Sequence, residues 1–145
     1  QHFWCLNPER ADMRQTLEAI LKTWPEGQQP KLHFSSPRTE LREQVHVDKK
    51  TKKKVVKHVA PVFTGHADFC SPFEFATFMR IAEGLDFDVM LEAKAKDLAL
   101  MRLRPDLLRY APDVAARFGL KAEDAGELEA ESDEVVEEEA VAGGA

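Results

Sequence analysis

Residues 71–92, SPFEFATFMRIAEGLDFDVMLE, combine a helix and a strand in one short stretch and decide the fold class. A Ser-Pro pair at its start, with a glutamate three residues after Ser71, is typical of a helix N-terminus, because serine caps free backbone N–H groups and proline fits the first turn. Apolar residues then recur at helical spacing until Gly84, a residue type that often ends a helix. The core residues expected from this spacing include Phe73, Phe75 and Phe78. Residues 87–92 are mostly apolar, which predicts a strand buried on both faces.

Further helices and strands are predicted on both sides of this stretch. An Asn-Pro pair at residues 7–8 predicts the start of a helix that ends near Trp24, and residues 31–36 predict a short strand. A last helix is expected after the strand at 87–92, with an interruption at Pro105. Strands that alternate with helices over short connections pair in parallel, so the sequence predicts an α/β fold.

The number of strand–helix units indicates what kind of α/β fold this is. Two or three units do not close a sheet, so we expect residues 1–121 to be the C-terminal part of a (β/α)8 TIM barrel, a fold of about 250 residues. The chain begins at Gln1 rather than at a methionine, and we expect a fragment whose N-terminal part is missing. An open doubly wound sheet is the alternative. It is less favoured, because no glycine-rich phosphate-binding sequence follows a predicted strand.

The charge of the chain is divided unevenly along its length. The sequence has 20 Lys and Arg residues against 26 Asp and Glu residues, a net charge of −6, but ten of the acids lie from Glu123 onward without any Lys or Arg among them. Residues 1–121 therefore carry a net charge of +4. We expect residues 122–145 to form a disordered tail, because they are acidic and of low complexity.

Two features bear on the cellular compartment. The two cysteines, Cys5 and Cys70, cannot form a disulfide framework, so we expect a reducing cytoplasm. No apolar run approaches the roughly 18 residues that a membrane-spanning helix needs, so we expect no association with a membrane.

Residues 44–60 are predicted to form an inserted β-hairpin. Val45 and Val47 alternate with polar residues, a turn is expected at 48–52, and a second valine-rich run follows. Six lysines crowd this segment: Lys49, Lys50, Lys52, Lys53, Lys54 and Lys57. Such a segment can bind nucleic-acid phosphates, and a merely solvated surface is an equally open interpretation.

Histidines and acids lie at or after the ends of the predicted strands. His2 is expected at the end of a further strand, of which only the last part is present. Barrel enzymes have their active sites at the C-terminal ends of their strands, and imidazole and carboxylate groups there suit divalent ions such as Mn, Zn or Mg. Each histidine alone could instead be an ordinary hydrogen-bonded residue, whereas Glu92 at the end of an apolar run needs a compensating charge. The polar residues at these positions are His2, Lys31, His33, His66, Asp68 and Glu92.

Three stretches of the sequence resemble UV-damage endonucleases, which are relatives of endonuclease IV among the xylose-isomerase-like barrels. They are PKLHFSS at 30–36, GHADF at 65–69 and DFDVMLEAKAKDLAL at 86–100. The resemblance covers about residues 1–110, and its most specific part is 89–100. It implies a TIM barrel in which a cluster of divalent ions, usually manganese, hydrolyses the phosphodiester 5′ to a UV photoproduct.

The resemblance also implies roles for individual residues. The implied metal ligands are His2, His33, His66 and Glu92, and the aspartate that accompanies the first of them in the family would lie before Gln1. Lys31 matches a lysine that family members can carry in carboxylated form beside the metals. Lys31 and Glu92 are therefore the predicted catalytic residues.

Other residues are expected to support this site. Asp68, two residues after His66, is a candidate to orient that histidine, although it could simply cap the loop. The residues expected to contact DNA phosphates are Arg38, Lys49, Lys50, Lys52, Lys53 and Lys54. The stretch between Ser35 and His66, which contains the hairpin, is longer than in the shorter members of the family.

The sequence thus predicts a metal-dependent endonuclease, with Mn²⁺ as the expected ion, that cuts UV-damaged double-stranded DNA in excision repair and acts as a monomer in the cytoplasm. One alternative is another enzyme on the same barrel, such as an abasic-site endonuclease or a sugar isomerase. A second is a non-catalytic nucleic-acid-binding module in which the histidines are structural. The basic body and the lysine-rich hairpin favour a DNA enzyme over an isomerase.

Overall fold

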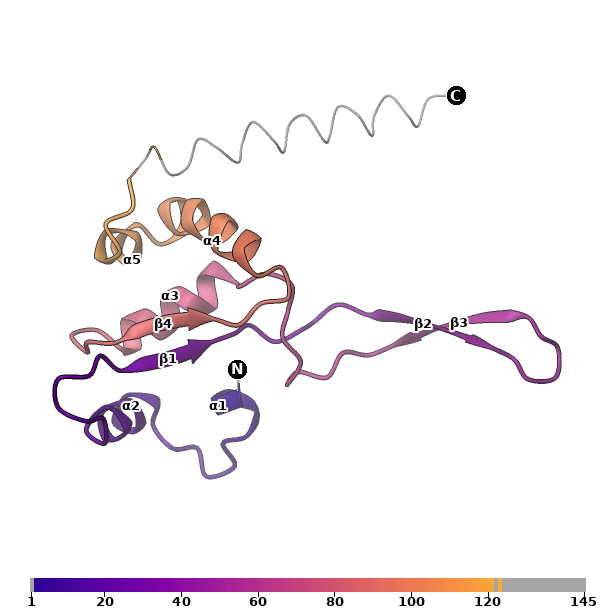
Figure 1. The fold of residues 1–145 in the computed structure, drawn as a ribbon, viewed down its shortest axis with the longest axis horizontal. Helices are drawn as coiled ribbons and strands as arrows, with labels where there is room; N and C mark the ends of the chain where they lie inside the picture. The colour runs from indigo at the N-terminus through magenta and orange to yellow at the C-terminus, as the bar shows by residue number, and fades with distance from the viewer. Residues whose placement is uncertain (1, 122, 124–145) are drawn as a thin grey trace.

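A small α/β body and a projecting two-stranded arm make up the protein in the computed structural model, which describes residues 2–121 and 123 (Figure 1). In chain order the elements are α1 (His2–Cys5), α2 (Met13–Leu21), β1 (Lys31–Phe34), β2 (Arg42–Val47), β3 (Lys54–Val59), α3 (Pro72–Ile81), β4 (Asp88–Leu91), α4 (Asp97–Tyr110) and α5 (Pro112–Arg117). Among the described residues, no helix is both long and apolar enough to cross a lipid bilayer. Apart from Glu123, the predicted acidic tail lies outside the described residues.

β1 and β4 form a parallel two-stranded sheet in the body (Figure 1). Their register sets Lys31 opposite Asp88 and Phe34 opposite Leu91. The chain that connects them includes α3, as a parallel connection requires, because the second strand can begin only after the chain has returned along the sheet. The predicted α/β arrangement with parallel strands is confirmed, while closure into a barrel stays a prediction.

α3, α4 and α5 cover the face of this sheet to which Phe34 points. Phe34 stands edge-on to Phe75 of α3, with ring centroids 5.0 Å apart, a geometry that favours aromatic contact. Leu103 of α4 and Val114 of α5 complete this core and are almost fully buried. Because successive side chains of a strand alternate between its faces, His33 points to the opposite side.

The start of α3 is capped as the sequence predicts. Ser71 Oγ accepts a hydrogen bond from the Glu74 N–H at 3.4 Å. The Ser71 N–H in turn donates to Ser36 Oγ at 2.9 Å, which ties the helix start to the residues that follow β1. After the helix, Gly84 adopts a φ of +76°, in the left-handed region that glycine enters without a steric penalty.

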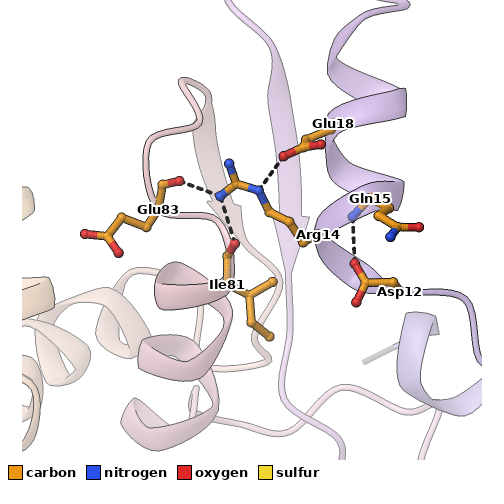
Figure 2. Close-up of polar contacts among 6 residues, drawn as sticks. All are labelled: Asp12, Arg14, Gln15, Glu18, Ile81 and Glu83. Carbon is orange, nitrogen blue, oxygen red and sulfur yellow. Dashed lines mark hydrogen bonds and ion pairs between the residues drawn. The ribbon is translucent and has the colours of Figure 1, made fainter.

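Arg14 joins α2 to the C-terminal end of α3 (Figure 2). Its guanidinium donates to the Ile81 carbonyl at 3.1 Å and to the Glu83 carbonyl at 2.5 Å, and its Nε donates to Glu18 at 2.6 Å. Carbonyls at a helix end have no donor within the helix, so an arginine there satisfies them. Within α2 only Leu17 is buried, and this contact therefore does much to hold the helix on the body.

β2 and β3 form the arm, an antiparallel hairpin in the segment where the sequence predicts one. Val45 lies opposite Val56 in its register. At the turn, the Asp48 carboxylate accepts hydrogen bonds from the Thr51 and Lys50 N–H groups, at 2.7 and 2.8 Å, and these bonds lower the pKa of Asp48 below its usual value. Backbone groups, rather than lysine side chains, therefore hold the turn.

The Asn-Pro pair does not start α2, contrary to the sequence prediction. Asn7 instead holds a turn, because its side chain makes two hydrogen bonds of 2.9 Å with the backbone of Ala11. The helix begins at Met13, since Asp12 accepts a hydrogen bond from the Gln15 N–H and acts as its cap. Asn and Asp both suit the N-cap position, so the sequence offered two starting points for this helix.

α4 continues through Pro105, where the sequence predicts an interruption. Pro105 has no N–H to donate to the Met101 carbonyl, and a proline inside a helix costs about 3 kcal/mol. Ala99, Leu103 and Leu107 lie at four-residue intervals on both sides of it, and all three are buried. The packing of this apolar stripe outweighs the local preference of the proline.

Two predictions about strands are also wrong. β4 is not buried on both faces, and Met90 is 43% exposed. The reason is that the described sheet has two strands and that α3, α4 and α5 pack on one of its faces. His2, expected at the end of a strand, lies instead in the short helix α1.

The contact between α3 and α5 predicts a stability that depends on pH. Arg80 donates two hydrogen bonds to the Asp113 carboxylate, at 2.8 and 2.7 Å, and they lower the pKa of Asp113 to about 2. A carboxyl with a lowered pKa stabilises the fold above the unfolded-chain value of about 3.9, and this contribution is lost as the pH falls through the folded value. We expect Asp113→Asn to lower the urea midpoint at pH 7. Urea titrations should show the difference from the unaltered protein shrink as the pH is lowered from 4 toward 2, and a constant difference would contradict this assignment.

Candidate functional site

His33 and Glu92 meet at the C-terminal end of the parallel sheet. His33 lies in β1, and Glu92 follows β4 directly, where its N–H donates to the Phe34 carbonyl at 2.8 Å. The register that pairs His33 with Met90 turns Glu92 to the same face, because alternate residues of a strand share a face. His33 Nδ1 and Glu92 Oε1 are 2.6 Å apart, so the two side chains share a hydrogen bond.

His66 reaches the same carboxylate from the loop that follows β3. Its Nε2 lies 3.6 Å from Oε2 of the glutamate. Backbone hydrogen bonds hold the loop on both sides: the Arg38 N–H donates to the Gly65 carbonyl at 2.8 Å, and the Lys94 N–H donates to the Ala67 carbonyl at 3.0 Å. These bonds fix His66 between the residues that follow β1 and those that follow β4.

His2 joins this group from α1. Its ring stands at 87° to the ring of His66, edge to face, with the centroids 5.7 Å apart. Four side chains from separate segments thus gather near one another, although they are far apart in the sequence. We call this set the histidine cluster; it consists of His2, His33, His66 and Glu92.

Glu92 is the anion of the histidine cluster. The hydrogen bond with His33 is the largest cause that lowers the pKa of Glu92 below its ordinary value. Partial burial opposes this effect, and the neighbouring charges of His33, His66 and His2 add to it. Glu92 is therefore ionised at neutral pH and can attract a cation or accept protons from donors.

The donor types of the cluster suit a divalent ion, but the side chains are not arranged around one. Imidazole nitrogen and carboxylate oxygen are ligands of Mn and Zn. Within residues 2–121 and 123, no three His, Cys, Asp or Glu side chains form a metal-binding arrangement. Two ligands of one ion lie about 3 Å apart or more, whereas His33 and Glu92 bond to each other at 2.6 Å. In the same part of the chain, His66 Nδ1 is buried without a hydrogen-bond partner, so Nε2, which faces Glu92, is the ring nitrogen that could bind an ion beside this carboxylate.

Arg38 and Asp68 pair with each other near His66. Arg38 Nη2 donates to Asp68 Oδ1 at 2.5 Å, and the arginine side chain is only 25% exposed. Asp68 thus contacts a guanidinium rather than the His66 ring that the sequence suggested for it. The pair braces the loop that carries His66, while the roles of Asp68 on the histidine and of Arg38 on DNA stay predictions.

Lys31 lies on the same face of β1 as His33 but farther from the end of the sheet. It begins the strand, is exposed, and lies opposite Asp88. Sequence reasoning missed Asp88, although counting back in twos from Glu92 along a strand reaches it. Its position makes Asp88 the acidic neighbour of Lys31 on this face.

The lysines predicted to contact DNA lie in β3 and in the turn before it, and Figure 1 shows this arm extending away from the body. All of them are exposed: Lys49, Lys50, Lys52, Lys53 and Lys54. The structure therefore separates most predicted site residues into the histidine cluster and a basic arm. Lys31, Arg38 and Asp68 belong to neither group.

Comparison with known protein families shows which family this sequence belongs to. The family described as UV-endonuclease UvdE matches residues 1–118. The chain belongs to this family. The resemblance seen in the sequence is thus confirmed, and the histidine cluster and the arm both lie within the matched residues of this UV-endonuclease family member.

Several curated relatives of this chain carry the name UV DNA damage endonuclease. One from Bacillus velezensis is 31% identical over 109 residues, which are 73% of this chain and 28% of the relative. One from Bacillus cereus is 32% identical over 98 residues, which are 66% of this chain and 25% of the relative. The chain therefore spans about a quarter of the length of the relatives it matches. No solved structure matches the chain.

Proposed function

We propose that the protein is a metal-dependent endonuclease that hydrolyses the phosphodiester 5′ to UV photoproducts in double-stranded DNA during excision repair. Membership of the UV-endonuclease family supports the reaction class. The observation that carries the proposal is the convergence of three histidines, from α1, β1 and the loop after β3, on the single carboxylate of Glu92.

The histidine cluster would hold divalent ions, with Mn²⁺ as the expected metal. Bound ions of this kind lower the pKa of a bound water and stabilise the charge of the attacking and leaving oxygens in phosphodiester hydrolysis. Neutral imidazoles of His2, His33 and His66 would supply nitrogen ligands, and His66 Nε2 faces the Glu92 carboxylate. The ionised Glu92 would supply the anionic ligand. Lys31, on the same face, would bind a phosphate oxygen as a cation.

We further propose that β1 and β4 are neighbouring strands of a (β/α)8 barrel. α3, α4 and α5 cover one face, and the other carries Lys31, His33 and Glu92, as the interior of a barrel enzyme would near its catalytic end. Parallel sheets are normally covered on both faces, and the 43% exposure of Met90 on this face fits a strand that further strands would cover. The monomeric state and the cytoplasmic location stay predictions.

Removal of the metal tests the proposed reaction. We expect the full-length protein, stripped with EDTA, to leave irradiated duplex DNA intact and to cut it once Mn²⁺ is restored, because the histidines and Glu92 alone provide no activated water. Gel analysis of an end-labelled duplex, irradiated or not, would measure this. Equal cutting of the unirradiated duplex, or cutting only at an abasic site, would favour a different nuclease on the same fold. Failure to retain Mn²⁺ or Zn²⁺ together with failure to cut would favour a binding module.

A further inference from the structure

The arm exposes both of its faces along most of its length. Val45 and Val56, which lie opposite each other, are 60% and 50% exposed, and Val47 is 55% exposed. Figure 1 shows β2 and β3 extending away from the helices of the body. A lone two-stranded hairpin is only marginally stable in water, so such an arm is suited to a surface that covers one of its faces.

The register of the arm sorts its side chains onto two different faces. Opposite residues of an antiparallel pair share a face, and the face alternates along each strand. One face, which we call the basic face, has no acidic residue and comprises Arg42, Gln44, His46, Val55, Lys57 and Val59. The other, which we call the valine face, comprises Glu43, Val45, Val47, Lys54, Val56 and His58. On the valine face the one acid, Glu43, pairs with His58 at 3.2 Å.

The tip of the arm adds further positive charge. Four lysines lie in or beside the turn: Lys49, Lys50, Lys52 and Lys53. The Asp48 carboxylate there is occupied by backbone N–H groups of the turn. The lysine ammonium groups at the tip are therefore left to bind an anion from outside the arm.

The arm is rooted at the histidine cluster. His66 forms an antiparallel bridge with Pro37, and the Arg38 N–H donates to the Gly65 carbonyl at 2.8 Å, so the two ends of the arm are joined beside a cluster residue. β1, which carries His33, leads into the arm, and the chain that leaves it reaches His66. A polyanion long enough to pass the cluster would therefore also meet the arm.

We propose that the arm is a second binding element for duplex DNA, in which the basic face and the tip lysines contact phosphates of the duplex whose reacting phosphodiester lies at the histidine cluster. The inference rests on the proposed function, because it takes DNA as the substrate. A two-stranded β-ribbon fits the major groove, and lysines bind its phosphates without regard to sequence. The valine face points away from the duplex.

The salt dependence of DNA binding tests the role of the tip. Each phosphate contacted contributes about 0.9 to the slope of log K against log salt, so we expect the triple change Lys49→Gln, Lys50→Gln and Lys53→Gln to reduce the slope by up to about 2.7. Fluorescence anisotropy of the full-length protein with an undamaged 20-base-pair duplex, without metal, would measure it. Lys52, with a φ of +58°, is left unchanged to avoid altering the turn.

A matched control removes the same charge from the helical side of the body. Lys22→Gln, Arg102→Gln and Arg109→Gln together should change the slope by less than about 0.5, because the proposed duplex does not contact α2 or α4. Equal slopes for the two triple variants would overturn the proposal. So would a tip variant that binds polyglutamate more weakly but duplex DNA normally, since the partner of the arm would then be an acidic polypeptide.

A second pair of variants tests which face meets the DNA. Lys57→Gln and Lys54→Gln each remove one charge from β3, on opposite faces of the arm. We expect the basic-face change to reduce the slope by about 0.9 and the valine-face change to leave it nearly unaltered. The proposal thus replaces Lys54, expected from the sequence to contact DNA, with Lys57 on the basic face. The reverse order would overturn the assigned face.

Failure of this proposal is distinguishable from failure of the proposed function. Binding to undamaged duplex without metal reports on the arm, whereas cutting of irradiated duplex with Mn²⁺ reports on the histidine cluster. A protein that cuts irradiated DNA but has the same salt slope with and without the tip lysines would overturn the arm proposal alone.

Discussion

Glu92→Gln is expected to reduce the cutting of irradiated duplex by at least about 100-fold in the presence of Mn²⁺. Glutamine keeps the shape of the side chain but removes the only negative charge of the histidine cluster, so His2, His33 and His66 would face a neutral amide. Changes to residues that merely support metal ligands already cost about 10–100-fold in metal affinity or activity, and loss of a ligand should cost more. The rate of cutting of an end-labelled duplex at saturating Mn²⁺, together with the affinity for Mn²⁺ measured by calorimetry, would test this.

Two controls separate this effect from a loss of folding. Glu83→Gln removes the same charge from an exposed side chain after α3 and should leave cutting unchanged. Glu92→Gln itself should change the free energy of unfolding by no more than about 1 kcal/mol, because the Glu92 side chain is 36% exposed and its ion pairs are solvated. Normal cutting by a folded Glu92→Gln protein would remove Glu92 from the proposed site.

The meeting of His33 and Glu92 could be predicted from the sequence, because it depends on short-range patterns alone. Two strands separated by a helix pair in parallel, and their C-terminal ends then lie at the same edge. Because side chains alternate between the two faces of a strand, Lys31 and His33 lie on one face. The same counting places Asp88 and Glu92 on one face, so Asp88 was within reach of sequence reasoning even though it was missed.

The positions of His66 and Asp68 could not be derived in this way. His66 follows a long segment whose ends are joined only because the hairpin folds back and the Pro37–His66 bridge forms. That closure depends on pairing between distant residues, which no local pattern shows. Asp68 likewise meets Arg38, 30 residues earlier in the chain, rather than its neighbour in the sequence.

The two errors in the predicted helices have different physical causes, which are local hydrogen bonds at the start of α2 and packing in α4. Asn7 and Asp12 both suit a helix N-cap, and α2 starts at the second of them. Pro105 disfavours a continuous α4, yet the buried stripe through Leu103 and Leu107 holds the helix together. Local propensities are weak compared with the burial of several apolar side chains, so tertiary contacts override them.

Phe75→Ala is expected to lower the free energy of unfolding by about 3–5 kcal/mol, the range for removing a buried aromatic ring. Phe75 is 3% exposed, and its ring lies against those of Phe34 and Phe118, with centroids 5.0 and 5.8 Å away. The vacated space borders β1, so the neighbouring rings cannot close it without moving the strand that carries His33.

The same helix offers a matched control for this prediction. The sequence prediction that Phe73, like Phe75, belongs to the core is wrong, because residues two apart lie on nearly opposite sides of a helix. Phe73 is 62% exposed, and its ring centroid lies 5.3 Å from that of Tyr110. Phe73→Ala should therefore cost less than about 1 kcal/mol. Urea unfolding of the two full-length variants, followed by tryptophan fluorescence, would measure both free energies. Equal losses of free energy would mean that the two rings are equally buried, which would contradict this core. A large loss for Phe75→Ala alone would establish that α3 packs on β1 through this ring.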